Sequence, residues 1–447
     1  MRKIIILTFL TFAITAKSQE IKSLTLKDAI TYALENKADA KKAKLKVENS
    51  EYQIQEVRAR ALPQISANGG LTYNPILQTT FLDAGSFGGT PGQTIKANFG
   101  QKWSSTAGLS LTQNLFDQSV FTGLKAAKST REFYQINEQL TEEQVIERVA
   151  NNYYQVYVQR QNLNVLDSTF INTTKVKNII KGQFDNGLAK KIDLDRILVK
   201  ISNINTQRQQ VLNAVQIQEN ALKFYMGMPI ETKIEIPQAA FEVSPQSFTE
   251  TPNTETRTEF LLMKKQEQLL EFQKKSVIAG LYPTLSLTAG YNYIGQGPKM
   301  PWGGKPTDGV YWSDFSSVGL NLKVPIFSGF ETRSKIRKAD VELRSLQEDL
   351  KDTKLSLDLD YANAKTQIDN SMITIQNQKA NAQLAKEVLS NTKNNYVQGL
   401  ASLTDLLDAE NAFTEAQNNY TAAILDYKLA EIQLIKSKGE LKTLINN

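Results

Sequence analysis

Apolar residues recur every seven positions along much of the chain, a spacing that predicts helices packed as coiled coils. Near the end of the sequence this repeat comprises Leu406, Phe413, Tyr420, Tyr427, Leu434 and Leu441. A second track, three positions on, comprises Ala409, Ala416, Ala423 and Ala430. Because alanine side chains are small, the second track predicts that another helix approaches this one closely.

A longer helix is predicted immediately before this one. Its seven-residue repeat comprises Tyr361, Ile368, Ile375, Ala382, Leu389 and Tyr396. Neither proline nor glycine occurs between Phe330 and Gln398, so nothing interrupts a helix there. At ~1.5 Å per residue the helix would be roughly 100 Å long.

Both repeats have counterparts 212 residues earlier in the chain. The counterpart of the final helix comprises Leu194, Ile201, Arg208, Val215 and Leu222, and that of the longer helix comprises Val149, Val156, Leu163, Phe170, Lys177 and Phe184. Gly227 and Gly439 follow the two final helices at equivalent positions. The chain is therefore predicted to contain two internal repeats of one design.

Alternating apolar and polar residues predict a pair of β-strands before each long helix. The segments are 63–73 and 107–116 in the first half, and 283–294 and 317–327 in the second. Each is close to the ~9–11 residues of a tilted membrane strand. A soluble antiparallel sheet with one wet face alternates in the same way. Since small barrels need about eight strands, four strands form a barrel only together with further copies of the chain.

These elements divide the chain into two repeats and a linker. Residues 19–227 form the first repeat and residues 256–447 the second. Residues 228–255, which contain four prolines, form the linker. A shorter helix is expected to open each repeat, at 26–62 and at 253–281.

Residues 1–18 predict a signal peptide that directs export. They combine Arg2 and Lys3 with an apolar core and a small-x-small site at 16–18. No later segment has 18 consecutive apolar residues, so no transmembrane helix is expected. The sequence has no cysteine, which argues against a lipoprotein, disulfides and thiolate metal sites.

Charge and residue types narrow the classes of function. The net charge is +6 and falls when the signal peptide is removed, and no dense basic patch predicts nucleic-acid binding. The sequence contains no histidine, the commonest general base and metal ligand. We therefore expect no catalytic residues, no metal and no cofactor. A hydrolase that uses carboxylates alone remains an alternative.

The two halves share a Gly-Leu-Ala turn between their long and final helices. These turns are Gly187-Leu188-Ala189 and Gly399-Leu400-Ala401, and an Asp-Leu pair follows each of them. Glycine can adopt positive φ, which ends a helix and lets the chain reverse. Each leucine is then either an exposed apolar side chain that contacts a partner or one folded back onto its own hairpin.

With these motifs the chain resembles the TolC-like outer membrane factor family. The most specific segments are LTLKDAITYALENK, NLFD, VPIFSGF and the doubled Gly-Leu-Ala followed by Asp-Leu. The resemblance implies a homotrimer whose strands form a twelve-stranded outer-membrane β-barrel in contact with lipid. Long coiled-coil hairpins would form a periplasmic α-barrel. Such ducts serve tripartite efflux pumps or type I secretion, together with a periplasmic adaptor (membrane fusion) protein and an inner-membrane transporter.

The resemblance also implies roles for individual residues. Gly187, Leu188 and Ala189, with Gly399, Leu400 and Ala401, would be the tips that contact the adaptor. Asp405 and Asp408 match paired aspartates that ring the constriction. Asp193 and Tyr396 match a polar link between helices that helps to hold the closed state.

Three positions leave the bonding of this gate open. Asp405 also fits a capping box with Ser402, which by itself explains an acid at that position. Ala401 stands where some members of the family carry an arginine. Arg196 could form an ion pair with Asp405 or Asp408.

An exported coiled-coil or adhesin-like surface protein is the main alternative function. Such a protein would share the export signal and the heptads. It would not need two pairs of amphipathic strands at matched positions. The cargo cannot be read from the sequence.

Overall fold

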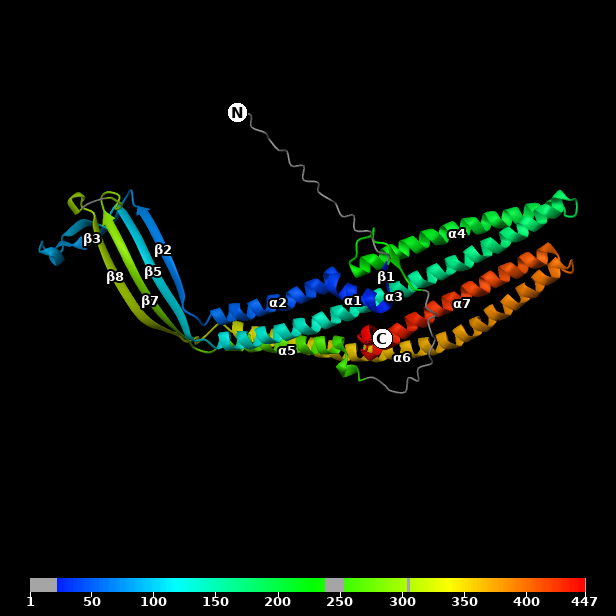
Figure 1. Cartoon of the computed structure of the whole chain (residues 1–447). Coiled ribbons are helices and arrows are strands. Elements are labelled where there is room, and N and C mark those ends of the chain that lie inside the picture. Colours follow the sequence, from blue (N-terminus) through cyan, green and yellow to red (C-terminus); the bar gives the residue numbers. More distant parts are fainter. Residues whose placement is uncertain (1–21, 238–252, 304–305, 447) are drawn as a thin grey trace, which may run out of the picture. The chain divides into compact units, whose positions relative to one another are not determined.

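The computed structural model describes residues 22–237, 253–303 and 306–446 (Figure 1). The predicted signal peptide, 1–18, lies outside these residues. The chain divides into two compact units, which are described separately. The helical unit comprises residues up to Lys46, Gln135–Leu262 and residues from Leu350 on. The sheet unit comprises Val47–Tyr134 and Met263–Asp349.

Four antiparallel strands form the main sheet, in the order β2-β5-β7-β8. Their bounds are Gln64–Tyr73 for β2, Trp103–Phe116 for β5, Thr284–Gly297 for β7 and Tyr311–Lys323 for β8. Each strand overlaps the segment where the alternation predicts it, although β5 begins four residues before its predicted segment and β8 six residues before. The strand expected to reach Phe327 instead ends at Lys323, because Pro325 has no N–H with which to extend the ladder.

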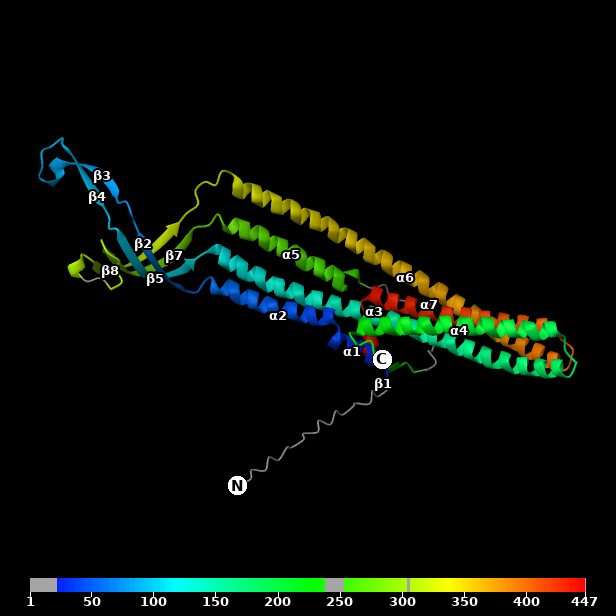
Figure 2. The ribbon, with the colours of Figure 1, turned by 90° about the horizontal axis from the view of Figure 1, so that it is seen from above.

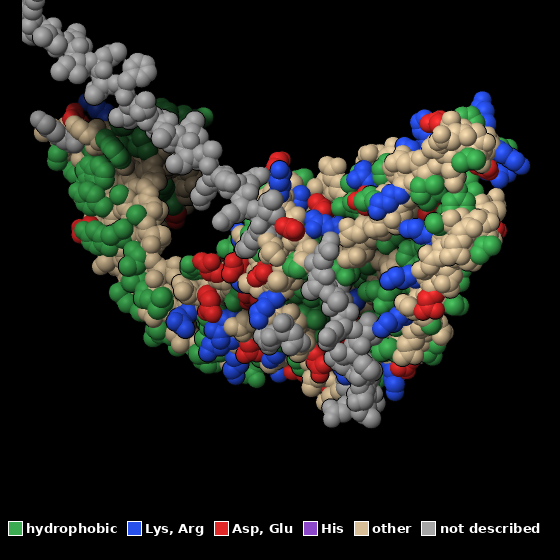
Figure 3. All heavy atoms as spheres, turned by 45° about the vertical axis from the view of Figure 1, so that its right-hand side comes forward, with side chains coloured by type: hydrophobic (Ala, Val, Ile, Leu, Met, Phe, Trp, Pro, Cys, Tyr) green, Lys and Arg blue, Asp and Glu red, His purple; other side chains and the backbone are tan. Residues whose placement is uncertain are grey.

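The register of the sheet separates an apolar face from a polar one. Leu287 lies opposite Leu320, and Ala289 opposite Val318. Residues at the alternate positions are mostly small and polar, and Ser66 and Ser110 share a hydrogen bond of 2.7 Å between their hydroxyls. Val318 is 78% exposed, so the apolar face is uncovered in the single chain. The side chains visible over the sheet, at the left of Figure 3, are mostly hydrophobic.

A second hairpin between β2 and β5 was not predicted. It consists of β3 (Gln78–Asp83) and β4 (Thr94–Phe99), joined through the short helix η1 (Ala84–Phe87). The Asp83 carboxylate stabilises its loop by accepting hydrogen bonds from the backbone N–H groups of Gly85, at 3.1 Å, and Gly92, at 3.0 Å. The glycine-rich composition of this segment resembles that of an irregular loop, which concealed the two short strands.

The helix expected between Phe330 and Gln398 has its predicted length, and its counterpart in the first half is almost equally long. Helix α3 spans Gln118–Asp185 and α6 spans Glu331–Val397. Each is followed by a helix of 36 residues, α4 (Lys191–Met226) and α7 (Leu403–Lys438). Gly227 and Gly439 end these helices in the left-handed conformation, with φ of 72° and 77°.

The helix expected at 26–62 is broken into α1 (Leu26–Asn36) and α2 (Ala38–Ala59). At the break, Lys37 is extended and its ammonium donates to the Phe224 carbonyl at 2.9 Å. A Cβ on Gly227 would lie 2.9 Å from the Asn36 carbonyl oxygen. The chain therefore bends where it passes the end of α4, and this distant contact outweighs the local preference for helix.

The remaining elements are short, apart from α5. One helix was expected at 253–281. The structure instead has a short 3-10 turn, η2 (Thr254–Thr256), followed by helix α5 (Thr258–Ala279). In the linker, β6 (Ile234–Glu235) pairs in parallel with β1 (Lys22–Ser23). The other short helices are η3 (Pro306–Asp308) and α8 (Thr443–Asn446).

Heptad positions supply much of the contact between α6 and α7 in the helical unit. One cluster joins α6 to α7 through Ala364, Ile368, Ile375, Ala423, Tyr427, Ala430 and Leu434. Ala423 and Ala430 belong to the alanine track and are buried in this cluster, but the backbones of α6 and α7 stay farther apart than the close approach that the track predicts. A second cluster gathers residues of α1, α3, β6 and the ends of α4 and α7. None of the described helices is both long and apolar enough to cross a membrane.

Replacing Gly227 with alanine should destabilise the protein more than the same change at Gly399. Both residues have positive φ, which costs an ordinary residue roughly 1–2 kcal/mol. Only Gly227 also faces backbone atoms, whereas a Cβ at Gly399 would meet nothing within 4 Å. Thermal melts followed by far-UV circular dichroism measure the difference. Gly182→Ala is the control: it lies within α3 with open space around it and should stabilise by ~0.5–1 kcal/mol. Equal losses at Gly227 and Gly399 would contradict the packing argument.

Candidate functional site

Two similar turns end the long helices of the helical unit. Gly187 and Gly399 have φ of 74° and 77°. In the first turn the N–H groups of Leu188 and Gly187 donate to the carbonyls of Gln183, at 2.7 Å, and Phe184, at 2.9 Å. The second turn repeats this pattern at Leu400 and Gly399. These paired bonds define a Schellman motif, which satisfies the last carbonyls of each helix.

The leucine of each turn projects into solvent. Leu188 is 80% exposed and Leu400 is 75% exposed, so neither folds back onto its own hairpin. Ala189 and Ala401 are half-buried beside them. Of the two alternatives that the sequence left open, the exposed leucine is the one that the structure contains.

A single apolar cluster holds the two turns at the same end of the helical unit (Figures 1 and 2). Its buried members are Val176 and Ile180 of α3, Ile197 of α4, and Leu403 and Leu406 of α7. Leu389 and Tyr396 of α6 pack against it. All four long helices thus contribute, and the two hairpins are joined close to their turns. We call this end, from Phe184 to Lys200 and from Tyr396 to Asn411, the tip region.

Ser402 and Asp405 form the capping box that begins α7. The Asp405 N–H donates to the Ser402 hydroxyl at 3.1 Å. The Asp405 carboxylate accepts from the Ser402 hydroxyl at 2.7 Å and from the Ser402 backbone N–H at 2.8 Å. These hydrogen bonds lower the pKa of the Asp405 carboxyl below its ordinary value. Asp405 is nevertheless exposed, so one carboxylate can cap the helix and still face solvent.

The other predicted polar residues lie around this cap. Asp408 is exposed one turn further along α7. Asp193 lies in the first turn of α4, and its negative charge reaches Tyr396 of α6. Burial, followed by that charge, raises the pKa of the Tyr396 hydroxyl. No hydrogen bond joins Asp193 to Tyr396 in the described part of the chain.

Within the described residues, Arg196 pairs with neither Asp405 nor Asp408. Its guanidinium donates to the Thr404 hydroxyl at 3.2 Å. Lys200, one turn further along α4, donates to the Asn411 side-chain oxygen. Thr404 and Asn411 were not singled out from the sequence, because neutral polar residues beside acidic ones give no distinctive signal.

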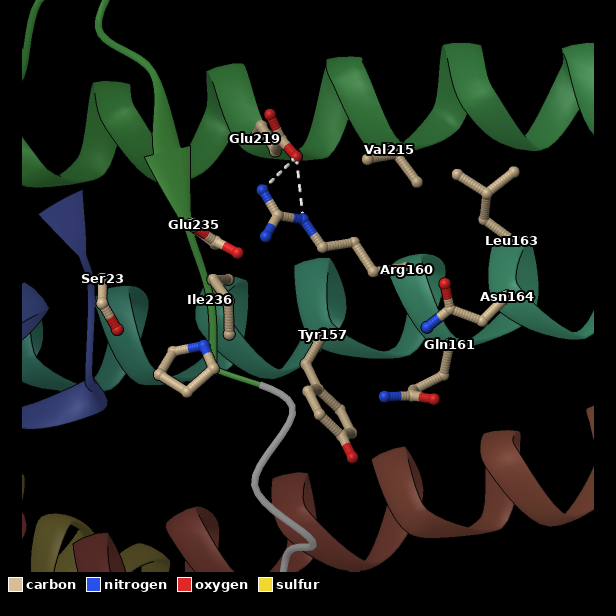
Figure 4. A pocket seen from close by; sticks show the side chains of 11 residues that line it. Ser23, Tyr157, Arg160, Gln161, Leu163, Asn164, Val215, Glu219, Glu235 and Ile236 are labelled. Atoms are coloured by element: carbon tan, nitrogen blue, oxygen red, sulfur yellow. Dashed lines mark hydrogen bonds and ion pairs between the residues drawn. The ribbon is translucent and has the colours of Figure 1, made fainter. Parts of the chain in front are cut away.

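A cavity of about 590 Å³ lies between α3, α4 and β6, away from the tip region (Figure 4). Arg160 spans it and donates to Glu219 Oε1 through Nε, at 3.0 Å, and through Nη2, at 2.6 Å. Nη2 also donates to the Ile234 carbonyl at 2.9 Å. This arginine therefore fixes β6 against both helices. Within the described residues no cluster of acidic side chains is arranged to hold a metal ion.

Comparison with known proteins identifies the family. The model of the outer membrane efflux protein family matches residues 29–228 and 259–440. The chain belongs to this family. It is 24% identical to outer membrane protein TolC of Vibrio cholerae serotype O1 over 348 residues, covering 75% of this chain and 77% of that protein. It is 24% identical to the alkaline protease secretion protein AprF of Pseudomonas aeruginosa, covering 84% of this chain and 76% of AprF.

A solved structure has the same fold. The outer membrane protein VceC of Vibrio cholerae aligns with a TM-score of 0.72 at 16% identity, covering 93% of this chain and 96% of VceC. The mainly helical fold with antiparallel strands is therefore that of the TolC-like outer-membrane channels. As a member of the outer membrane efflux protein family, the chain is an outer-membrane exit duct for efflux or secretion.

Ser402→Ala should loosen the first turn of α7. Losing an N-cap hydroxyl typically costs about 1 kcal/mol of helix stability. Hydrogen-exchange mass spectrometry of peptides from the start of α7 should show faster exchange. Because the pKa of Asp405 is depressed, its stabilising effect is present above the ordinary carboxyl pKa and is lost as the pH falls through the depressed value. The difference in exchange rate between Ser402→Ala and the parent protein should therefore become smaller at acidic pH. Ser390→Ala, within exposed α6, should leave this exchange unchanged.

Proposed function

We propose that the protein works as a passive homotrimeric duct, powered by its partners, whose periplasmic end is closed at the tip region. The observation that carries this proposal is the pairing of two exposed Gly-Leu-Ala turns through one apolar cluster. The exposed turns provide a surface for docking. The cluster beside them forms a packing seam, at which α7 could separate from α3 and α4.

The sheet supports a shared barrel. β2 and β8 are the outer strands of the four-stranded order, and each has one edge without a paired strand among the described residues. Such edges pair readily with other chains. Three copies supply twelve strands, which place the apolar face against outer-membrane lipid and the polar face toward a lumen. The long helices then form the periplasmic α-barrel.

The chain organisation fits two structural repeats of one design. Residues 19–227 and 256–447 each contain a shorter helical segment, two strands of the main sheet, a long helix and a helix of 36 residues. Residues 228–255 connect them. Residues 1–18 are the proposed signal peptide, and the duct is not anchored by a lipid.

The gate proposal assigns Asp405 and Asp408 to the constriction. Both are exposed near the start of α7, and in a trimer they would place six carboxylates around one axis. Crowded like charges attract cations. Asp193, Tyr396 and Arg196 lie on the neighbouring helices and would hold the closed arrangement.

The partner proposal assigns the tips, residues 187–189 and 399–401, to contact with a periplasmic adaptor (membrane fusion) protein. An inner-membrane transporter would supply the cargo. AprF is named for secretion of alkaline protease, and the family for efflux, so both kinds of cargo are compatible with this duct.

Replacing both Asp405 and Asp408 with alanine should let ions pass through the duct more freely. Single-channel recordings in planar bilayers should show higher conductance and block by divalent cations weakened on the order of tenfold, because the carboxylate ring is gone. Asp426→Ala removes an exposed acid of α7 that is ~30 Å from the cap and should change neither property. Unchanged conductance in the double variant would place the constriction elsewhere.

Leu188→Ser and Leu400→Ser should weaken docking without unfolding the chain, because both side chains are exposed. Burying a leucine contributes ~1.5–3 kcal/mol, so each loss should weaken association by roughly tenfold to a hundredfold. A photo-crosslinking residue placed at either position, followed by mass spectrometry, identifies the partner. Pull-downs with that partner then measure the loss. Leu188→Met and Leu400→Met keep an apolar side chain and should bind normally; equal binding by the serine variants would exclude the tips as the contact.

A further inference from the structure

A buried carboxylate, separate from the proposed constriction, links the two hairpins. Glu410 of α7 is 6% exposed, and its Oε2 accepts a hydrogen bond from the Thr173 hydroxyl at 3.2 Å. Thr173, on α3, is fully buried. One turn further from the tips, the hydroxyls of Thr169 and Thr414 lie 3.4 Å apart. This α3–α7 contact continues the apolar cluster of the tip region but is built from polar groups.

Two cations face this carboxylate from the other helices. Lys200 lies on α4 and Lys393 on α6, and both favour the ionised form of Glu410. Burial has the larger effect and raises the pKa of the Glu410 carboxyl, against the Thr173 hydrogen bond and the two lysines. Burial likewise lowers the pKa of the Lys200 ammonium. Neighbouring groups therefore do not fully offset the cost of burying the Glu410 carboxylate or the Lys200 ammonium.

We propose that Glu410 is a protonation-controlled latch that holds α7 against α3 when it carries a proton and loosens this seam when it ionises. The latch rests on the proposed function, in which separation of the two hairpins at the tips opens the duct. Glu410 contacts no cargo in this proposal. It is a positioning residue that acts through the packing of α7.

The direction of the pH effect follows from the environment of the carboxyl. A carboxyl whose folded-state pKa is raised stabilises the packed arrangement below its ordinary pKa, and this stabilisation is lost as the pH rises through the raised value. An ionised Glu410 keeps its charge in a buried site, where the low dielectric makes it unfavourable. Acidic surroundings should thus tighten the seam, and neutral surroundings should loosen it.

The first test measures single-channel conductance of the purified protein while the pH is varied from about 4 to about 8, a window that begins just below the ordinary glutamate pKa of ~4.3. Parent protein should show a rise in open probability with pH. Glu410→Gln, which cannot ionise, should stay at the low value and lose this rise. Thr173→Val and Lys200→Met each remove a group that favours the carboxylate, so each should move the midpoint to higher pH.

Controls separate the latch from general destabilisation. Glu415→Gln makes the same change at an exposed glutamate of α7 and should keep the parent profile. If Glu410 had only a structural role, Thr173→Val and Lys200→Met would change the stability of the protein. The pH midpoint of the rise in open probability would then stay at the parent value. An unchanged pH profile in Glu410→Gln would overturn the proposal.

The second test does not depend on conduction. Hydrogen-exchange mass spectrometry of peptides within residues 402–414, corrected for the intrinsic pH dependence of exchange, should show roughly tenfold faster opening in the parent at neutral than at acidic pH. Glu410→Gln should remain protected at both. If no variant conducts, the duct proposal fails while this measurement still decides the latch; equal protection of the parent protein at both pH values would refute the latch itself.

Discussion

The packing of α7 against both helices of the first hairpin is the constraint on which the tip region depends. Its apolar part is the cluster around Ile180, Ile197 and Leu406, and its polar part is the contact of Glu410 with Thr173. Without this seam the two hairpins would be joined mainly by the cluster at the other ends of α4 and α7, and their turns would be free of one another. The seam places both exposed leucines with Asp405 and Asp408 at one end, so in the proposed duct docking and closure would share a single set of contacts.

Periodicity made the helices predictable, because a heptad pattern is a property of local sequence. Positive-φ glycines likewise mark the turns at Gly187 and Gly399 without help from distant contacts. The break at Lys37 could not be predicted, because it is caused by Phe224 and Gly227, far away in the chain. The partner of Arg196 was missed for the same reason. Charge complementarity favours a carboxylate, but the geometry of α4 and α7 presents the Thr404 hydroxyl.

The sheet shows the same division between local and distant causes. Alternation predicted four strands, and pairing of β5 with β7 brings the two halves of the chain together. Both faces remain exposed in one chain, although the apolar face, with Val318 and Leu320, is costly to leave in water. A lone chain therefore leaves its edges and its apolar face unsatisfied. In the proposed trimer, lipid would cover the apolar face and further copies of the chain would pair with the edges, so assembly and membrane insertion are expected to be linked.

Opening is more easily explained by changes in the seam than by changes in the turns. The turns are fixed by backbone hydrogen bonds within each helix end, such as Leu188 to Gln183, and these bonds contain no group that titrates. The seam combines side-chain contacts with a buried carboxyl whose preferred state depends on pH. Separating α7 from α3 would break only side-chain interactions, each of modest strength. In the proposed duct, the rigid turns would therefore carry the force of a docked partner to the seam without unfolding the helices that they end.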